Sequence, residues 1–439
     1  MKFALIGQDI PSLLPALLAD LFYAHREEAE AVILERNEAM RDLAERYGLA
    51  VTKRAGCGHV TATANRAEAL RDADCVIYAG EPMASSRFRM DREALSGVDD
   101  DDAGLCDQAR TLGGIGGLMR TLRQGDAVYD LCDAMQIQCP HALVITLGEP
   151  VGRTVEMFRS RGFTAWGLTA GWRKGAAGLL GLCGRLGAKP EDVEAVAAGL
   201  PHFTFLTALR DRKTGRSLLP MLEEKTQSGE NGRLAQRWLD MFGAVSVGDV
   251  GNHAALMPAQ EDYEPDPDPS LSEPVEKRKE RILRMNTAAE KGLRDPEGQA
   301  AQLLLLSTAP AARPVQLALA LLEKRDLELD AAVRANTNRV IVNLPREAII
   351  EAPLTLKDGI EQSKGITLPG ALADLCLDID DASRLAARAA SGDREALREC
   401  VELDPALGGL DRLYCLDAVN RMIGMHSDIL SRWGEEEDD

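Results

Sequence analysis

The sequence predicts an α/β protein with a Rossmann-like parallel-sheet domain over residues 1–172, followed by an α+β, largely helical domain over residues 173–439. Three observations support this. Short apolar runs alternate with helical repeats in the first half, as in βαβ units. A glycine directly follows the first run, Lys2–Ile6. From about Lys174 the pattern changes to longer helical stretches. With 439 residues, two domains are more probable than one.

In the first half, runs of apolar residues predict buried strands, and leucines and alanines that recur every three or four residues predict helices. The predicted strands are Lys2–Ile6, Ala31–Leu34, Asp72–Tyr78, Ala142–Leu147 and Phe163–Leu168. The predicted helices are Ser12–Tyr23, Glu38–Tyr47 and Ala127–Gln136. Parallel strands that alternate with helices in this way form the sheet of nucleotide-binding domains.

In the second half, the same periodicities predict a mixture of helices and short strands. The predicted helices are Ala188–Ala198, Gly232–Phe242, Val275–Lys291 and the segments after Leu368. The predicted strands are His202–Leu209, which runs into a turn at Asp211–Gly215, and the short pieces Asn338–Asn343 and Ala348–Glu351. Met257–Pro274 is rich in proline and acidic residues and is predicted to be a loop.

Charge and cysteine content limit the partners of the protein. The chain has 51 basic and 70 acidic residues and a formal charge of -19. Such an acidic surface repels phosphate backbones, so we expect no nucleic-acid partner. No apolar run is long enough to cross a membrane, and the first residues do not resemble a signal peptide. We therefore expect a soluble, cytoplasmic protein. The nine cysteines form no CxxC pair, so in such a protein we interpret them as small buried apolar residues.

A dinucleotide fold needs glycines where its first strand ends, because they let the backbone approach the pyrophosphate. Gly7 takes this place, and Glu35 ends the second predicted strand, where a ribose hydroxyl would bind. Gly80 follows the third predicted strand. However, Asp9 adds a negative charge to the first loop and Pro11 lacks an N–H donor. These residues therefore fit either a dinucleotide site or a nucleotide fold that holds its nucleotide poorly.

A second glycine cluster, with Gly113 and Gly114 at its start, precedes a predicted helix. Such a loop can present backbone N–H groups to an anion such as a cofactor phosphate. It can equally be a close-packed turn between a helix and the sheet. Both interpretations remain open from the sequence.

Several short motifs follow the predicted strands or lie in the second half. They are Gly113-Gly114 with Arg120, Gly148-Glu149-Pro150, Gly167-Leu168-Thr169-Ala170, Gly199-Leu200-Pro201-His202, and Asn343-Leu344-Pro345 through Glu351-Ala352-Pro353. Together these segments resemble glycoside hydrolase family 4, with their order preserved from residue 1 to about residue 430. The resemblance implies a fold related to lactate and malate dehydrogenases, and a sugar glycoside as substrate. It also implies a homo-oligomer, either a dimer or a tetramer.

The resemblance further implies a reaction that uses NAD and a divalent metal, usually Mn²⁺. In that reaction the sugar C3 hydroxyl is oxidised, a tyrosine removes the C2 proton, and the aglycone leaves by elimination. The implied metal positions are His202 and Thr169, where the family has a histidine and a cysteine. Thr169 departs from the family, because a neutral hydroxyl is a much poorer ligand than a thiolate. Ala170, next to it, can transfer no proton.

Other departures concern the groups that move protons. Glu149 takes the place of a substrate-binding asparagine and is a candidate catalytic carboxylate. His253 lies where one branch of the family has a second histidine, and it is the other catalytic candidate. The nearest tyrosine to the expected base is Tyr263, in the acidic loop. His202 could also be a core histidine, and Glu149 could simply cap a turn.

Three functions remain open from the sequence. The first is a glycosidase with a rewired site that uses Glu149, His202 and His253. The second is a catalytically silent relative that binds a sugar, a nucleotide or a protein. The third is a simple dehydrogenase, which is the weakest, because no histidine and carboxylate pair is recognisable in the sequence as a proton relay.

Overall fold

The computed structural model describes residues 1–7, 10–25, 27–80, 84–96, 105–106, 111–169, 178–227, 232–257, 275–296 and 314–433. The strands of these residues form one sheet of 12 strands in the order β3-β2-β1-β4-β5-β6-β10-β11-β7-β8-β9, with β12 paired to β11. The predicted fold class is confirmed. Asp9, Ala170, Tyr263 and most of the predicted loop at Met257–Pro274 lie outside the described residues.

The first six strands of the sheet are parallel to one another. Their order, 3-2-1-4-5-6, is that of a dinucleotide-binding domain. Their bounds are β1 (Lys2–Ile6), β2 (Glu30–Leu34), β3 (His59–Thr63), β4 (Cys75–Tyr78), β5 (Leu143–Thr146) and β6 (Ala165–Gly167). The strand β3 was not predicted, because it lies at the edge of the sheet and carries polar residues. The other five fall within or next to predicted strands.

The sheet continues across residue 172 through antiparallel strands. These are β7 (Val193–Leu200), β8 (Phe203–Asp211), β9 (Val245–Val247), β10 (Leu327–Ala335), β11 (Ile349–Lys357) and β12 (Ile360–Gln362). The helix predicted at Ala188–Ala198 is wrong. The strand β7 occupies most of that segment and pairs with β8 along its whole length, so tertiary pairing overrides the helix preference of its alanines.

The strand predicted at Asn338–Asn343 is also wrong. Only Ile341 makes a bridge there, to Ile366. The side-chain amide Nδ2 of Asn336 donates to the carbonyl oxygens of Ile341 and Leu344, at 2.7 and 3.0 Å. These two bonds hold the segment in a turn, so its backbone groups do not form a ladder.

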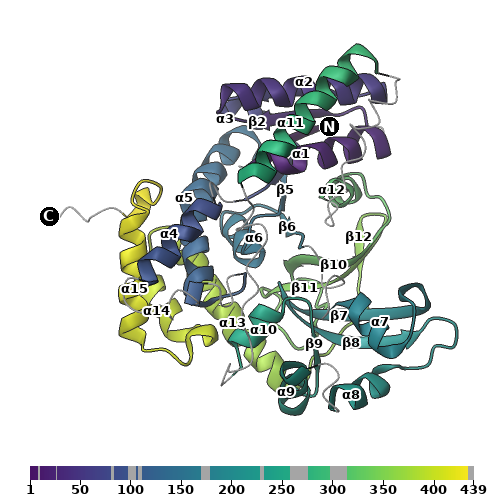
Figure 1. The fold of residues 1–439 in the computed structure, drawn as a ribbon, viewed down its shortest axis with the longest axis vertical. Helices are drawn as coiled ribbons and strands as arrows, with labels where there is room; N and C mark the ends of the chain where they lie inside the picture. Colours follow the sequence, from purple (N-terminus) through teal and green to yellow (C-terminus); the bar gives the residue numbers. More distant parts are fainter. Residues whose placement is uncertain are drawn as a thin grey trace.

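Helices cover both faces of the sheet (Figure 1). The helices of the first half are α1 (Ile10–Leu18), α2 (Glu38–Ala55), α3 (Arg66–Leu70), α4 (Ala84–Ser96), α5 (Gly114–Gln138) and α6 (Val151–Ser160). A π-helix at Ala19–Ala24 continues α1. The helices of the second half are α7 (Leu179–Leu186), α8 (Leu219–Gln227), α9 (Gly232–Phe242), α10 (Val250–Ala255), α11 (Val275–Arg294), α12 (Pro314–Leu322), α13 (Gly370–Ala389), α14 (Arg394–Leu403) and α15 (Arg412–Met425). The predicted helices at 232–242, 275–291 and after residue 368 are confirmed.

Helices from the second half complete the core of the first half. In Figure 1, α11 lies beside α2, and the contacts between these two helices agree with that view. The side chains of Met285 and Ala289 on α11 pack into the same apolar cluster as Phe3 and Leu5 on β1. No described helix is both long and apolar enough to cross a membrane.

A buried charged cluster joins α4, α5 and α15. Asp91 on α4 is fully buried and pairs with the guanidinium of Arg123 on α5. The other carboxylate oxygen of Asp91 lies 2.7 Å from Nε2 of His426, which directly follows α15. Arg87 contacts His426 and reaches Asp428 at the surface. Buried charges are tolerated when each has such a partner, so this cluster fixes the C-terminal helix against the first half.

Candidate functional site

Three glycines meet at the carboxyl ends of β1, β4 and β5, and we name this contact the glycine shelf (Gly7, Gly80 and Gly148). Gly7 has φ +124° and Gly80 has φ +105°, which are conformations that side chains disfavour. A Cβ atom on Gly7 would lie 3.0 Å from the backbone nitrogens of Ala79 and Gly80, and one on Gly80 would lie 3.1 Å from Cα of Gly148. The shelf therefore lets backbone approach closely at the edge where parallel sheets bind nucleotides.

Glu35 lies just beyond the end of β2, as the sequence predicts. Its Oε1 accepts a hydrogen bond from the backbone N–H of Asn37, at 2.8 Å. The side chain lines a small apolar pocket between α2 and α11, with Met40 on one wall and Ile282 and Met285 on the other. Glu35 therefore stands at the same edge of the sheet as Gly7, one strand away.

The loop at Gly113 and Gly114 has a structural role. The N–H of Gly114 donates to Oδ2 of Asp404, at 2.9 Å, and a Cβ atom on Gly113 would lie 2.8 Å from both carboxylate oxygens of Asp404. Asp404 is only 3% exposed, and Nη2 of Arg153 lies 3.6 Å from it. The loop does present an N–H to an anion, but that anion is an internal carboxylate. Of the two interpretations that the sequence leaves open for Gly113 and Gly114, these contacts favour the close-packed turn.

The most pronounced polar contact of the site joins two residues that the sequence singles out. Nε2 of His202 lies 2.8 Å from Oε1 of Glu149. Glu149 lies between β5 and α6, where its Oε2 accepts from the N–H of Val151 at 3.0 Å and its bond to Pro150 is cis. The His202 and Glu149 side chains are 16% and 25% exposed. Both side chains are therefore partly exposed.

His202 is held in a left-handed conformation in the turn between β7 and β8. Its φ is +60°, which is uncommon for a residue other than glycine. Its N–H donates to Oε2 of Glu351 at 2.8 Å, and its carbonyl accepts from Nδ2 of Asn252 at 3.1 Å. Because both backbone groups are fixed, the imidazole is directed by the turn itself.

Glu351 links His202 to Thr169. It lies on β11 and is 2% exposed, and its Oε1 accepts from the hydroxyl of Thr169 at 2.9 Å. We name the series Glu149, His202, Glu351 and Thr169 the polar chain. The sequence reasoning did not select Glu351 as a site residue, although a carboxylate beside Ile349 and Ile350 in a predicted buried strand was a usable signal.

The charges of the polar chain shift its pKa values in different directions. Burial alone would lower the pKa of His202, but the adjacent carboxylate of Glu149 outweighs it and raises the pKa to about 9. Burial opposes ionisation of Glu149, yet the charge and hydrogen bond of His202 bring its pKa below the ordinary value. Burial raises the pKa of Glu351. At neutral pH, His202 and Glu149 therefore form an ion pair with the proton on the imidazole.

His253 does not belong to this arrangement, and the expectation of a catalytic role for it needs correction. It is 1% exposed, and its ring nitrogens face the backbone carbonyls of Asp249 at 2.6 Å and Thr204 at 3.2 Å. Its ring packs against Phe203, Phe205 and Trp238. Burial lowers its pKa. Its environment is that of a core histidine.

The donor atoms of the site do not fit a manganese ion. Nε2 of His202 is engaged by Glu149, and the Thr169 hydroxyl is engaged by Glu351. Within the described part of the chain, no group of three or more histidine, cysteine, aspartate and glutamate side chains is arranged to hold a metal ion. Thr169 and His202 thus both contact Glu351, as members of the polar chain and not as ligands arranged around a metal ion.

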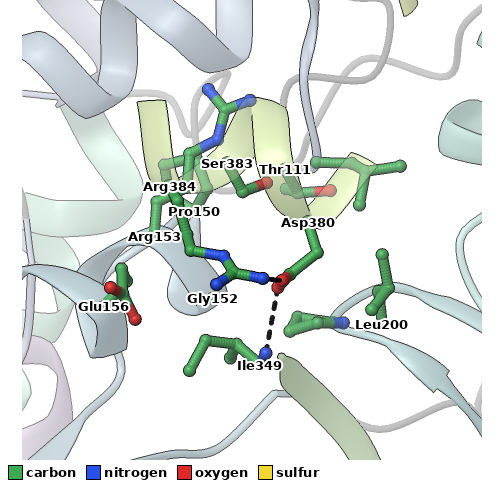
Figure 2. Close-up of a pocket in the computed structure, with 12 residues that line it drawn as sticks. Thr111, Pro150, Gly152, Arg153, Glu156, Leu200, Ile349, Asp380, Ser383 and Arg384 are labelled. Carbon is green, nitrogen blue, oxygen red and sulfur yellow. Dashed lines mark hydrogen bonds and ion pairs between the residues drawn. The ribbon is translucent and has the colours of Figure 1, made fainter. Parts of the chain in front are cut away.

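Figure 2 shows a pocket whose lining includes the chain neighbours of the pair. Pro150 and Pro201, the chain neighbours of Glu149 and His202, line it. In Figure 2 the carboxylate of Asp380 points toward Ile349, whose N–H it accepts at 3.0 Å, and toward Arg384, with which it forms an ion pair. Of the charged residues that line this pocket, Asp380 and Arg384 are therefore paired with each other.

Comparison with known protein families identifies this architecture. The model for family 4 glycosyl hydrolases matches residues 18–164, and the model for the C-terminal domain of the same family matches residues 197–407. The chain belongs to family 4 of the glycosyl hydrolases.

An α-galactosidase from Rhizobium meliloti (strain 1021) is 26% identical over 318 residues, which are 67% of this chain and 62% of that protein. The match thus spans less than two thirds of the relative's length. A solved structure of a putative glucosidase from Bacillus subtilis has a TM-score of 0.72 at 21% identity and covers 96% of this chain and 99% of its own. A 6-phospho-α-glucosidase from gut microorganisms, solved with NAD and Mn²⁺, has a TM-score of 0.70 at 17% identity and covers 98% of each chain. At these identities the solved structures establish the fold of this family 4 protein.

Proposed function

We propose that this family 4 protein is a glycosidase that holds NAD along the glycine shelf and uses the Glu149–His202 pair to protonate the departing aglycone. The observation that carries the proposal is the 2.8 Å contact between Nε2 of His202 and Oε1 of Glu149. The pair lies where β5 ends, directly after Gly148 of the shelf. A proton donor and a dinucleotide site would therefore adjoin in one cleft.

The glycine shelf supports the proposal of a dinucleotide. Gly7 and Gly80 let the loops after β1, β4 and β5 pack closely at the carboxyl edge of the sheet, where dinucleotides bind in this fold, and Glu35 lies at the same edge, one strand away. Relatives of the same fold have been solved with NAD. When bound, NAD supplies reversible hydride transfer at a sugar carbon. The part of this chain is to bind and orient the nucleotide beside the pair.

The Glu149–His202 pair stores one proton at neutral pH. The pKa of about 9 for His202 keeps the imidazole protonated, and Glu149 holds the ring in one orientation. A protonated group next to a partly exposed carboxylate suits transfer of a proton to the glycosidic oxygen as the bond to the aglycone breaks. Such a donor matters most when the departing alcohol is a weak acid.

We also propose that the protein is a cytoplasmic homo-oligomer, a dimer or a tetramer. All nine cysteines are free thiols, which suits a reducing compartment. Eight of them are buried, and burial raises the pKa of those such as Cys75 and Cys376, which makes them unreactive. Light scattering with size-exclusion chromatography measures the oligomeric state directly.

The test of the function measures sugar released from a panel of methyl and 4-nitrophenyl glycosides, with and without added NAD. Asparagine accepts positive φ values, so His202→Asn removes the imidazole while it preserves the turn. His141→Asn, at an exposed position, is the matched control. We expect NAD-dependent release that falls by about 100-fold or more in His202→Asn on methyl glycosides. Absence of release from every glycoside, or equal rates in both variants, contradicts the proposal.

A further inference from the structure

The place that the family resemblance assigns to a metal ion is filled by protein contacts in this chain. The two positions concerned are Thr169 and His202. The Thr169 hydroxyl donates to Oε1 of Glu351, and the imidazole Nε2 lies against Oε1 of Glu149. Both candidate ligand atoms are therefore already hydrogen-bonded to carboxylates.

We propose that the polar chain replaces the metal ion of family 4 in this protein, and that Thr169 and Glu149 are the two residues that close the site to transition metals. This inference concerns the site of the proposed glycosidase activity and rests on that proposal. It predicts that the protein does not bind Mn²⁺ at His202.

Distances support the closure at Glu149. An octahedral Mn²⁺ ion holds its nitrogen and oxygen ligands at about 2.2 Å, so two neighbouring ligands of one ion lie about 3.1 Å apart. The observed separation of Nε2 and Oε1 is 2.8 Å, which is that of a direct hydrogen bond. The second oxygen of Glu149 is held by the N–H of Val151. The carboxylate is thus fixed against the imidazole on one side and the helix start on the other.

Chemistry supports the closure at Thr169. A threonine hydroxyl is neutral and is a weak ligand for transition metals, whereas a thiolate is a strong one. To turn toward a metal, Thr169 would have to leave Glu351, which is 2% exposed. That carboxylate would then lose one of its two hydrogen-bond donors inside the protein, which is costly. Thr169 and Glu149, which replace the cysteine and asparagine of the family, therefore both favour hydrogen bonds within the protein over a bound metal ion.

The test measures metal binding without any substrate. Wild-type protein is dialysed against Mn²⁺, and the bound metal is quantified by elemental analysis. A double variant, Glu149→Asn with Thr169→Cys, restores the two residue types of the family. Co²⁺ is then titrated into it, because a cobalt–thiolate bond gives a charge-transfer absorption. The matched control is Glu149→Asn with Thr169→Ser, which keeps a hydroxyl. Circular dichroism and thermal unfolding confirm that each variant is folded.

We expect no stoichiometric Mn²⁺ in the wild type, and at least about tenfold tighter Co²⁺ binding in the double variant than in the serine control. Stoichiometric Mn²⁺ in the wild type that is lost in His202→Ala overturns the inference. So does a folded double variant that gains no Co²⁺, since the two residues would then not be what closes the site. If the double variant does not fold, the wild-type measurement alone decides. Because no outcome depends on turnover, a failure here is distinct from a failure of the proposed glycosidase activity.

Discussion

The Glu149–His202 pair should make a pH-dependent contribution to stability, which Glu149→Gln removes. A pKa that rises from 6.5 to about 9 corresponds to about 3 kcal/mol for His202 at 1.36 kcal/mol per unit. Because the two side chains are 16% and 25% exposed, solvent reduces this to about 2 kcal/mol. In a chain of this length that free energy lowers Tm by about 2–4 °C.

The direction of the pH dependence follows from the two pKa shifts. The raised pKa of His202 contributes stability that is fully present below pH 6.5 and is lost as the pH rises through about 9. The lowered pKa of Glu149 contributes stability that is present above 4.5 and is lost as the pH falls through its folded value. The difference between wild type and variant should therefore be largest at pH values from 4.5 to 6.5 and shrink above 9.

The assay is thermal unfolding of wild type and Glu149→Gln at pH 6 and pH 10, with Glu347→Gln at an exposed position as the control. Since both proteins share every other titrating group, the difference in Tm isolates the pair. An equal difference in Tm at both pH values would refute the reasoning, because Glu149 is ionised at both and its contribution would then not depend on the charge of His202. If the Glu347→Gln control also had a lower Tm than wild type, the loss of any carboxylate would lower the Tm in this way.

Other substitutions test the structure around the pair. Gly7→Ala should abolish the rise in Tm on addition of NAD, because the new Cβ atom would lie 3.0 Å from the backbone of Ala79 and Gly80. Gly162→Ala is the control and should keep the rise, since Gly162 also has a positive φ but has no atom within 4 Å of the added Cβ. Asp91→Asn should cost about 3 kcal/mol in chemical unfolding, because it leaves the buried guanidinium of Arg123 without its carboxylate. Asp428→Asn, whose side chain is 61% exposed, should cost less than about 1 kcal/mol. Asp404→Asn should lower the unfolding free energy by about 1–3 kcal/mol without changing the Tm rise with NAD, and loss of that rise would return Gly114 to the cofactor site.

The sequence predicted the parallel strands of the first half better than the antiparallel strands of the second half. The first strands are buried on both faces, so they read as apolar runs in the sequence. In contrast, β7 is rich in alanine, and only its pairing with β8 makes it a strand. The edge strand β3 escaped prediction because its residues are polar.

The sequence allowed individual site residues to be selected, but it did not predict which of them contact one another. Glu149 and His202 could be selected because their positions match a family pattern, but they are 53 residues apart and meet only when the β7–β8 turn folds over the end of β5. Glu351 comes from a third distant segment. His253 was misjudged because the aromatic residues that bury it lie on strands and helices whose packing no local pattern reveals.

The central claim is that the Glu149–His202 pair protonates the aglycone, and a comparison of leaving groups tests it most directly. Rates of wild type and Glu149→Gln are measured on the methyl and 4-nitrophenyl glycosides of one sugar. Nitrophenolate departs without a proton, so we predict a loss of about 100-fold or more on the methyl glycoside and of less than about 10-fold on the nitrophenyl glycoside. Equal losses on both substrates would contradict the account, because the pair would then act before the bond to the aglycone breaks.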